Sequence, residues 1–136
     1  MIEQLPDPEN RVMLDPNDRD MYGVPLPRIA YRIDDYVRAG LSAARAAHTE
    51  IFEKLGTSQI HHDPEFKGAG HIIGTARMGN DPKTSVVDSD LRSHEHRNLF
   101  VVGSAVFPTS STANPTLTIA ALSLRAIGSV KSVLMQ

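Results

Sequence analysis

The C-terminal stretch, residues 114–135, constrains the fold of this chain more than any other segment. Asn114 is a favoured helix N-cap, and Pro115 suits the first helical position because the N–H that it lacks would have no helical partner there. The residues that follow, such as Leu117 and Leu124, are apolar on nearly every side of a helix. We therefore predict a helix buried in a core, with the positive end of its dipole in a low-dielectric interior.

The same segment argues against a membrane span. Arg125, Lys131 and several Ser and Thr residues interrupt it, so we expect a buried soluble helix and no transmembrane segment. Residues 3–10 are polar and proline-rich, without the basic start and apolar stretch of a secretory signal. The compartment stays open between cytoplasm and periplasm.

Composition limits the classes of partner and chemistry. The chain has 136 residues, 40% of them hydrophobic, which is the size of one domain with a real core. Its net charge of -2 gives no broad attraction for phosphate backbones, so we expect no nucleic-acid partner. The sequence has no cysteine, which excludes disulfides, thiolate metal sites and cysteine nucleophiles.

The first half of the chain predicts strands and one helix. Residues 11–14 and 29–33 are strand-like runs, separated by a loop rich in proline and aspartate. A helix follows from Asp34 and Asp35, with apolar positions at helical spacing, and Gly56 is its expected C-cap. We expect this amphipathic helix to cover a sheet.

The second half alternates between loop and buried elements. Residues 59–97 are polar and show no period of 3.6 or 2, whereas residues 98–103, NLFVVG, predict a buried strand. A Ser/Thr-rich turn at residues 109–113 then leads to the helix at Asn114. A strand, a polar loop and a helix N-terminus together point backbone N–H groups at a ligand.

His71 is the candidate base. It lies among small residues, which let backbone and substrate come close, and imidazole can accept a hydroxyl proton near neutral pH. On its residue type alone, such a histidine is more often a surface or hydrogen-bonded core residue. Gly68, Gly70 and Gly74 imitate a dinucleotide-binding loop, but no hydrophobic strand precedes them and Pro82 prevents a long helix after them.

Histidine pairs raise the question of a metal. His61 and His62 are adjacent, so on an extended strand they point to opposite faces, and His94 and His96 belong to no known ligand motif. We expect no metal site. The sequence also lacks the G-x-S-x-G motif of a serine hydrolase.

Taken together, the second-half segments resemble the C-terminal region of glucose-methanol-choline (GMC) flavin oxidoreductases. Their order and spacing are similar to that family, and closest to the flavoprotein subunits of gluconate, fructose and glucose dehydrogenases. The matching segments are residues 71–79 (HIIGTARMG), 81–82 (DP), 85–88 (SVVD), 98–109 (NLFVVGSAVFPT) and 114–122 (NPTLTIAAL).

The resemblance implies an α+β fold (partial α/β), the C-terminal portion of a two-part FAD-binding fold. Residues 1–70 would be antiparallel strands and a helix of the substrate domain, residues 71–97 the active-site loop region, and residues 98–136 a strand and buried helix of the flavin domain.

The resemblance also implies roles for six residues. His71 matches the catalytic histidine and Asn114 its partner across the substrate. Gly103, Ser104, Pro115 and Thr116 match positions that contact FAD.

The implied enzyme would oxidise the CH–OH group of a sugar, sugar acid or polyol and pass electrons to a non-oxygen acceptor, with an electron-accepting cytochrome subunit as a partner. The N-terminal glycine-rich segment that grips the dinucleotide has no counterpart here, so we expect the chain alone to retain no flavin and to be inactive. Two alternatives stay open: a non-catalytic interaction module derived from this fold, and, less favoured, a histidine metal-binding protein.

Overall fold

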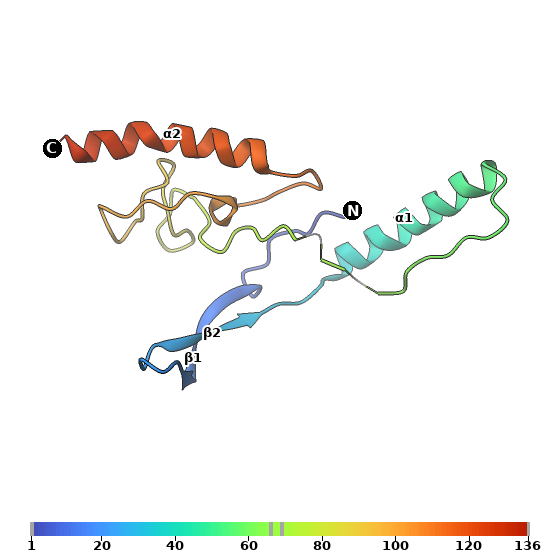
Figure 1. Ribbon diagram of the computed structural model, residues 1–136, viewed down its shortest axis with the longest axis horizontal. Coiled ribbons are helices and arrows are strands. Elements are labelled where there is room, and N and C mark those ends of the chain that lie inside the picture. The colour runs from blue at the N-terminus through green and yellow to red at the C-terminus, as the bar shows by residue number, and fades with distance from the viewer. Residues whose placement is uncertain (1, 66, 69, 136) are drawn as a thin grey trace.

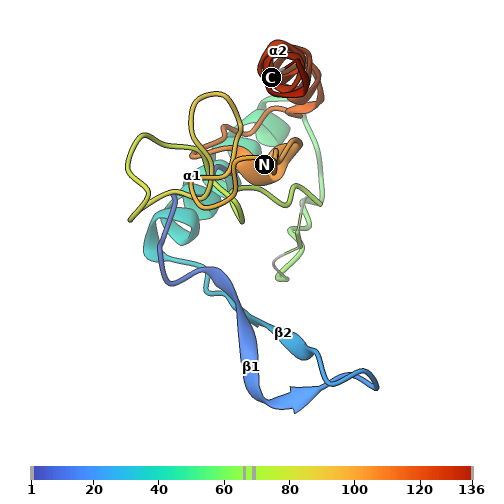
Figure 2. The same cartoon turned by 90° about the vertical axis from the view of Figure 1, so that its left-hand side faces the viewer.

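The computed structural model describes residues 2–65, 67–68 and 70–135. An antiparallel hairpin of β1 (Arg11–Arg19) and β2 (Pro25–Ala30) comes first, followed by α1 (Asp35–Lys54). A long irregular region with one 3-10 turn, η1 (Ser104–Val106), leads to α2 (Thr116–Leu134). The hairpin projects away from the body that the irregular region and α2 form (Figures 1 and 2). This mixture of strands and helices confirms the predicted α+β class.

The hairpin is longer and more tightly closed than predicted. β1 continues to Arg19, well past residue 14, and the second strand ends at Ala30 instead of residue 33. Arg11 pairs with Ala30, and the register shifts beyond residue 14. The expected long loop is reduced to a turn because the Asp20 carboxylate accepts hydrogen bonds from the N–H groups of Tyr22 and Val24, both at 2.9 Å.

Both predicted ends of α1 are confirmed. The Asp34 side chain accepts a hydrogen bond from the N–H of Val37 at 2.9 Å, as an N-cap does. At the other end Gly56 has φ +72°, and the N–H groups of Gly56 and Thr57 bond back to the carbonyls of residues 53 and 52. The expectation that α1 covers a sheet is wrong, because no residue of α1 is buried.

The core lies in the second half of the chain. Val87, Leu91, Val106, Phe107 and Ala126 are buried, and they bring the irregular loops, η1 and one position of α2 into contact. The core of this body is small, so each of its buried side chains contributes a large part of the packing.

The predicted buried strand at residues 98–103 is wrong. Phe100 forms an isolated bridge with Arg92, while Leu99 and Val102 are about half exposed. A continuous apolar run forms a buried strand only when neighbouring strands lie on both sides. In the described part of the chain no named strand borders this segment.

α2 forms as a helix, but it is not the buried helix that the sequence predicts. Ala126 is its one buried residue, and Leu117 is 83% exposed. The helix also begins later than expected: Pro115 is the N-cap, and no side chain, Asn114 included, caps the helix. By length and composition alone α2, with a mean hydropathy of 1.5, could cross a membrane, although a soluble core helix meets the same criteria.

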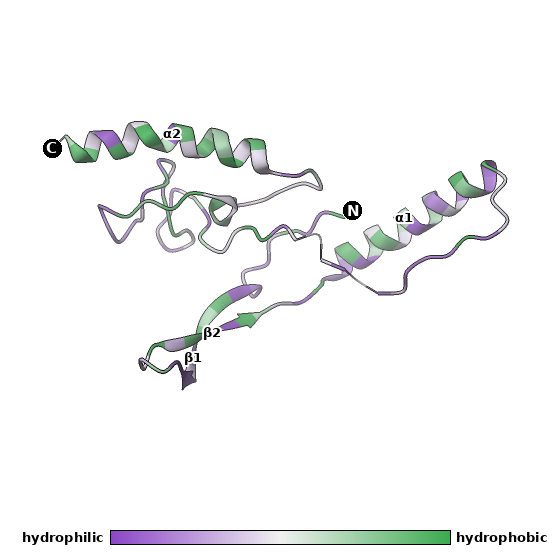
Figure 3. Cartoon of the chain, in the orientation of Figure 1, coloured by the Kyte–Doolittle hydropathy of each residue, from purple (hydrophilic) through white to green (hydrophobic). Residues whose placement is uncertain are grey.

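The chain exposes far more surface than a compact protein of its size. Its accessible area is 10448 Å², whereas a compact monomer of 14.9 kDa exposes about 7,000 Å². Apolar residues are prominent along α2 and on the hairpin (Figure 3). Exposed apolar surface of this kind is typical of sites that contact other molecules.

Leu91 gives a test of the core. It is fully buried yet has φ +63°, in the turn that Asp88 closes by accepting hydrogen bonds from the N–H groups of Asp90 and Arg92. We expect Leu91→Ala to lower the free energy of unfolding by about 3 kcal/mol through the cavity it leaves. Leu91→Gly should be about 1 kcal/mol more stable than Leu91→Ala, because glycine adopts this φ without strain. Urea unfolding measures both, and an alanine variant more stable than the glycine variant would contradict this reading of the turn.

The exposed face of α2 gives a second test. We expect the isolated chain to self-associate, and Leu124→Glu combined with Leu134→Glu to reduce that association, since both leucines are more than two-thirds exposed. Ala121→Glu is the control at an exposed position. It adds charge but replaces only a methyl group, so it should reduce self-association less than the leucine substitutions do. Sedimentation velocity provides the measurement. A wild-type chain that remains monomeric at high concentration would contradict the expected self-association through this surface.

Candidate active site

The segment after His71 lies along η1. The N–H groups of Gly74, Ala76 and Met78 donate to the carbonyls of the three η1 residues, Ser104 to Val106, at 3.2, 2.9 and 2.8 Å. We call this set of three hydrogen bonds the backbone ladder. It joins two stretches about thirty residues apart in sequence, and so fixes residues 74–78 against the segment that leads to α2.

Glycine is required where the ladder begins. Gly74 has φ +82°, and a Cβ atom there would lie 3.1 Å from the carbonyl oxygen of Phe107. Gly70, on the other side of His71, has φ +74°. His71 itself is half-buried between these two turns, and its imidazole makes no hydrogen bond within the described part of the chain. No described residue therefore occupies its ring nitrogens.

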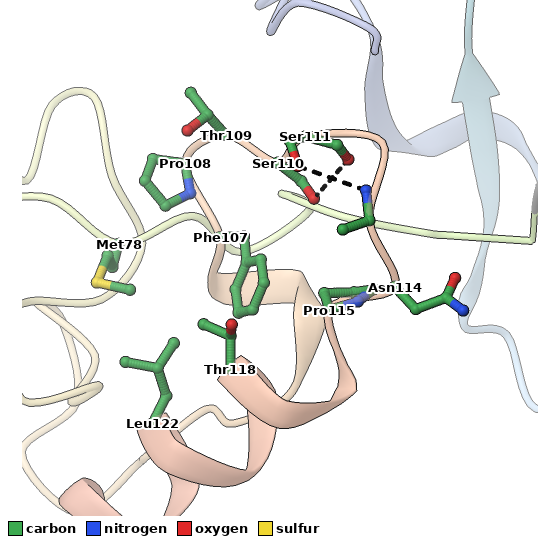
Figure 4. Close-up of a pocket in the computed structure, with 11 residues that line it drawn as sticks. Met78, Phe107, Pro108, Thr109, Ser110, Ser111, Asn114, Pro115, Thr118 and Leu122 are labelled. Atoms are coloured by element: carbon green, nitrogen blue, oxygen red, sulfur yellow. Dashed lines mark hydrogen bonds between the residues drawn. The ribbon is translucent and has the colours of Figure 1, made fainter. Parts of the chain in front are cut away.

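A cavity of about 370 Å³ lies between the Ser/Thr-rich turn and the start of α2 (Figure 4). Its wall combines the Phe107 ring and other apolar groups with hydroxyls from Ser110 and Thr118. The Ser111 hydroxyl accepts a weak hydrogen bond from the N–H of Ala113 at 3.4 Å, which helps to shape the turn. The residues that line the cavity are Met78, Phe107, Pro108, Thr109, Ser110, Ser111, Ala113, Asn114, Pro115, Thr118 and Leu122.

The predicted site residues fall into two groups. Asn114 and Pro115 line the cavity, and Thr116 is the first residue of α2 next to them. His71, Gly103 and Ser104 do not line it; they lie beside the backbone ladder. The structure does not bring the His71 and Asn114 side chains to one cavity, and the Asn114 amide points away from the Phe107 ring (Figure 4).

Most residues that line the cavity were not predicted as site residues. Met78, Phe107 and Thr118 all lie in family-like segments, but no role was assigned to them, and Met78 and Phe107 contribute to the core as well. Thr118 follows Pro115 by three residues, so the helical period alone places it on the same face. That spacing was the available signal for Thr118.

The N-terminus of α2 offers unused hydrogen-bond donors. Within the described chain no side chain caps this helix, and the N–H groups of Thr116, Leu117 and Thr118 have no acceptor; the first helical bond is from Ile119 to Pro115. Such a terminus attracts negative charge or carbonyl oxygens.

Gly103 adds an approach for a ligand beside η1. It has φ +102°, and a Cβ atom there would meet nothing within 4 Å. A flat cofactor can therefore come close to the backbone at this point. Open backbone at Gly103 and uncapped amides at α2 would each suit a flat ring that carries carbonyl acceptors.

His94 has a structural place. Its Nε2 lies 2.9 Å from the Ser85 hydroxyl oxygen and 3.1 Å from the Gly79 carbonyl. Because Ser85 donates its proton to the Asp81 carbonyl at 2.6 Å, Nε2 must carry the hydrogen and donate to both oxygens. His94 therefore pins the loop that follows the ladder.

The other histidine pair shows no metal arrangement. His62 Nε2 lies 3.1 Å from the Thr49 hydroxyl of α1. Across the residues that the structure describes, no three His, Asp or Glu side chains gather into a group that could hold a metal ion.

Comparison with known proteins decides the family. A family model described as GMC oxidoreductase matches residues 6–123, a span that includes both His71 and Asn114. The chain belongs to the GMC oxidoreductase family. This confirms the resemblance on which the sequence analysis relied. Members of this family are sugar- and polyol-oxidising enzymes and are generally FAD-dependent.

The GMC relatives cover the chain almost completely. It is 42% identical over 134 residues to the fructose dehydrogenase large subunit of Gluconobacter japonicus, which is 98% of this chain and 25% of that protein. It is 36% identical over 132 residues to paromamine 6'-oxidase of Streptomyces fradiae, 96% of this chain and 24% of that protein. It is 34% identical over 122 residues to the gluconate 2-dehydrogenase flavoprotein of Pantoea cypripedii, 83% of this chain and 20% of that protein. The chain thus spans about a quarter of the length of the relatives it matches.

Proposed function

We propose that this chain is the C-terminal catalytic part of an FAD-dependent oxidoreductase that oxidises the CH–OH group of a sugar, sugar acid or polyol. The observation that carries this proposal is the GMC family match over residues 6–123, which includes His71 and Asn114 in one continuous alignment. The identity to sugar dehydrogenases over nearly the whole chain supports the substrate class.

His71 has the role of general base in this proposal. Oxidation of an alcohol removes a hydride from carbon and a proton from oxygen, and bound FAD supplies the hydride acceptor. The His71 imidazole, which no other described group engages, takes the hydroxyl proton. The ladder holds the backbone after His71 in place while this happens.

Asn114 and the start of α2 act on the other side of the substrate. The Asn114 amide donates a hydrogen bond to the alcohol oxygen, and its exposed position leaves it free to turn toward a substrate. The free N–H groups of Thr116 to Thr118 favour negative charge on the flavin ring. Gly103, Pro115, Thr116 and the backbone of Ser104 would lie along the cofactor.

The remaining polypeptide of such an enzyme would supply the segment that binds the dinucleotide part of FAD. Relatives are about four times as long as the part that this chain matches, and the excess surface of α2 and the hairpin suits a partner of that kind. We therefore expect the chain alone to retain no FAD and to oxidise no substrate. Gel filtration of the chain with added FAD, read by absorbance, tests this, and a yellow, reducible protein peak would contradict it.

The similarity to dehydrogenases and oxidases suggests two electron acceptors for the whole enzyme. The fructose dehydrogenase relative is named a large subunit, which supports a further, electron-accepting subunit such as a cytochrome. The paromamine 6'-oxidase relative is named an oxidase, so oxygen is the alternative acceptor. Oxygen consumption during turnover separates the two cases.

Replacement of His71 tests the proposed chemistry. In a full-length enzyme that contains this chain, His71→Ala should slow flavin reduction by saturating sugar by about 100- to 10,000-fold, because a positioned base contributes that much. Stopped-flow absorbance of the flavin measures the rate. His61→Ala is the matched control, since His61 is exposed and makes no side-chain hydrogen bond in the described chain. Flavin reduction at a near-normal rate in His71→Ala would remove the base from the mechanism.

A further inference from the structure

We propose that Ser104 is a positioning residue for His71, and not a residue whose side chain binds the cofactor. The inference rests on the proposed function, because it assigns Ser104 to the same site. Its basis is a hydrogen bond in which the Ser104 hydroxyl donates to the Ile72 carbonyl oxygen at 2.6 Å. This is the carbonyl of the residue next to His71.

Ser104 grips the active-site loop twice. Besides the hydroxyl bond to Ile72, its own carbonyl accepts the hydrogen bond from the N–H of Gly74 at 3.2 Å. The two bonds straddle Ile73, which packs against the core cluster. One residue therefore fixes the peptide groups on both sides of Ile73, and with them the direction in which the chain leaves His71.

Among the residues that the structure describes, few other hydrogen bonds hold the loop near the base. On the N-terminal side of His71, Gly70 has φ +74° and open space around its Cα, so it permits movement instead of preventing it. The next ladder bond on the other side, from Ala76 to Ala105, is five residues away from His71. The hydroxyl of Ser104 is thus the tether closest to the imidazole.

The same geometry argues against the hydroxyl as a hydrogen-bond donor to the cofactor. A serine hydroxyl has one proton to donate, and the Ile72 carbonyl receives it. Gly103, immediately before Ser104, has the open backbone against which a flavin can lie. The two adjacent residues therefore have different roles. Gly103 leaves room for the cofactor, and Ser104 positions the backbone next to His71.

Hydrogen exchange tests the tether without relying on activity. In the 136-residue chain, Ser104→Ala should speed exchange of the hydrogen-bonded backbone amides of Gly74 and Ala76 by at least about tenfold, and Ser104→Thr, which keeps the hydroxyl, should restore most of the protection. Ser132→Ala is the matched control, because it removes a similar hydroxyl-to-carbonyl bond, to Ser129 at 2.7 Å, at the far end of α2. Unchanged exchange in Ser104→Ala would overturn the tether.

Kinetics of the full-length enzyme test the consequence. Ser104→Ala should lower the rate constant of flavin reduction by about 10- to 100-fold, with the KM for sugar and the flavin content unchanged, because a small misplacement of a reacting group has an effect of that size. Ser104→Thr should recover most of the rate. A wild-type reduction rate, or loss of flavin with normal exchange of the Gly74 and Ala76 amides, would contradict the positioning role. If His71→Ala reduces flavin normally while Ser104→Ala still speeds exchange, the proposed function fails and the tether stands.

Discussion

The arrangement of the second half of this chain depends on three backbone hydrogen bonds, which run from Gly74, Ala76 and Met78 to the consecutive carbonyls of η1. Without them, residues 71–79 would be held by the packing of Ile73 and Met78 and by the bonds of residues 77 and 79 to the loop around residue 87. With them, the loop that carries His71 is held against the segment that continues through Phe107 to the helix N-terminus. Gly74 makes the ladder possible, because any side chain there would press on the Phe107 carbonyl.

The body that the ladder organises is small, and this explains why so much of the chain is exposed. The core cluster is confined to the irregular loops, η1 and a single buried position of α2. The hairpin and α1 extend away from it (Figure 1). An area about half as large again as that of a compact monomer fits a chain whose α2 and hairpin pack against further polypeptide in a GMC enzyme.

Features that depend on neighbouring residues could be predicted from the sequence. The Asp34 cap and the Gly56 terminus of α1 are local hydrogen-bond patterns, and both were correct. The apolar run at residues 98–103 and the apolar surface of α2 were read as buried, which was wrong for the described chain, because burial depends on partners that local sequence does not contain. The start of α2 was missed by one residue for a smaller reason: Pro115 takes the cap position itself.

The candidate site likewise has features that local sequence predicts and features that depend on contacts between distant residues. Family-like segments were enough to single out His71, Asn114 and Gly103, since their order along the chain carries the signal. The tether from Ser104 to Ile72 and the cavity wall formed by Phe107 and Thr118 depend on contacts that no motif encodes. The structure does not bring the imidazole and the Asn114 amide to one cavity, so the proposed pairing around a substrate would require the rest of the enzyme.

A crystal structure of the full-length enzyme with FAD and a bound sugar would test the central claim most directly. We expect an imidazole nitrogen of His71 and the amide nitrogen of Asn114 to lie within hydrogen-bond distance of the same sugar hydroxyl, with the first N–H groups of α2 directed at the flavin ring and the ladder intact. A sugar oxygen held by other residues, with His71 turned away from it, would contradict the account.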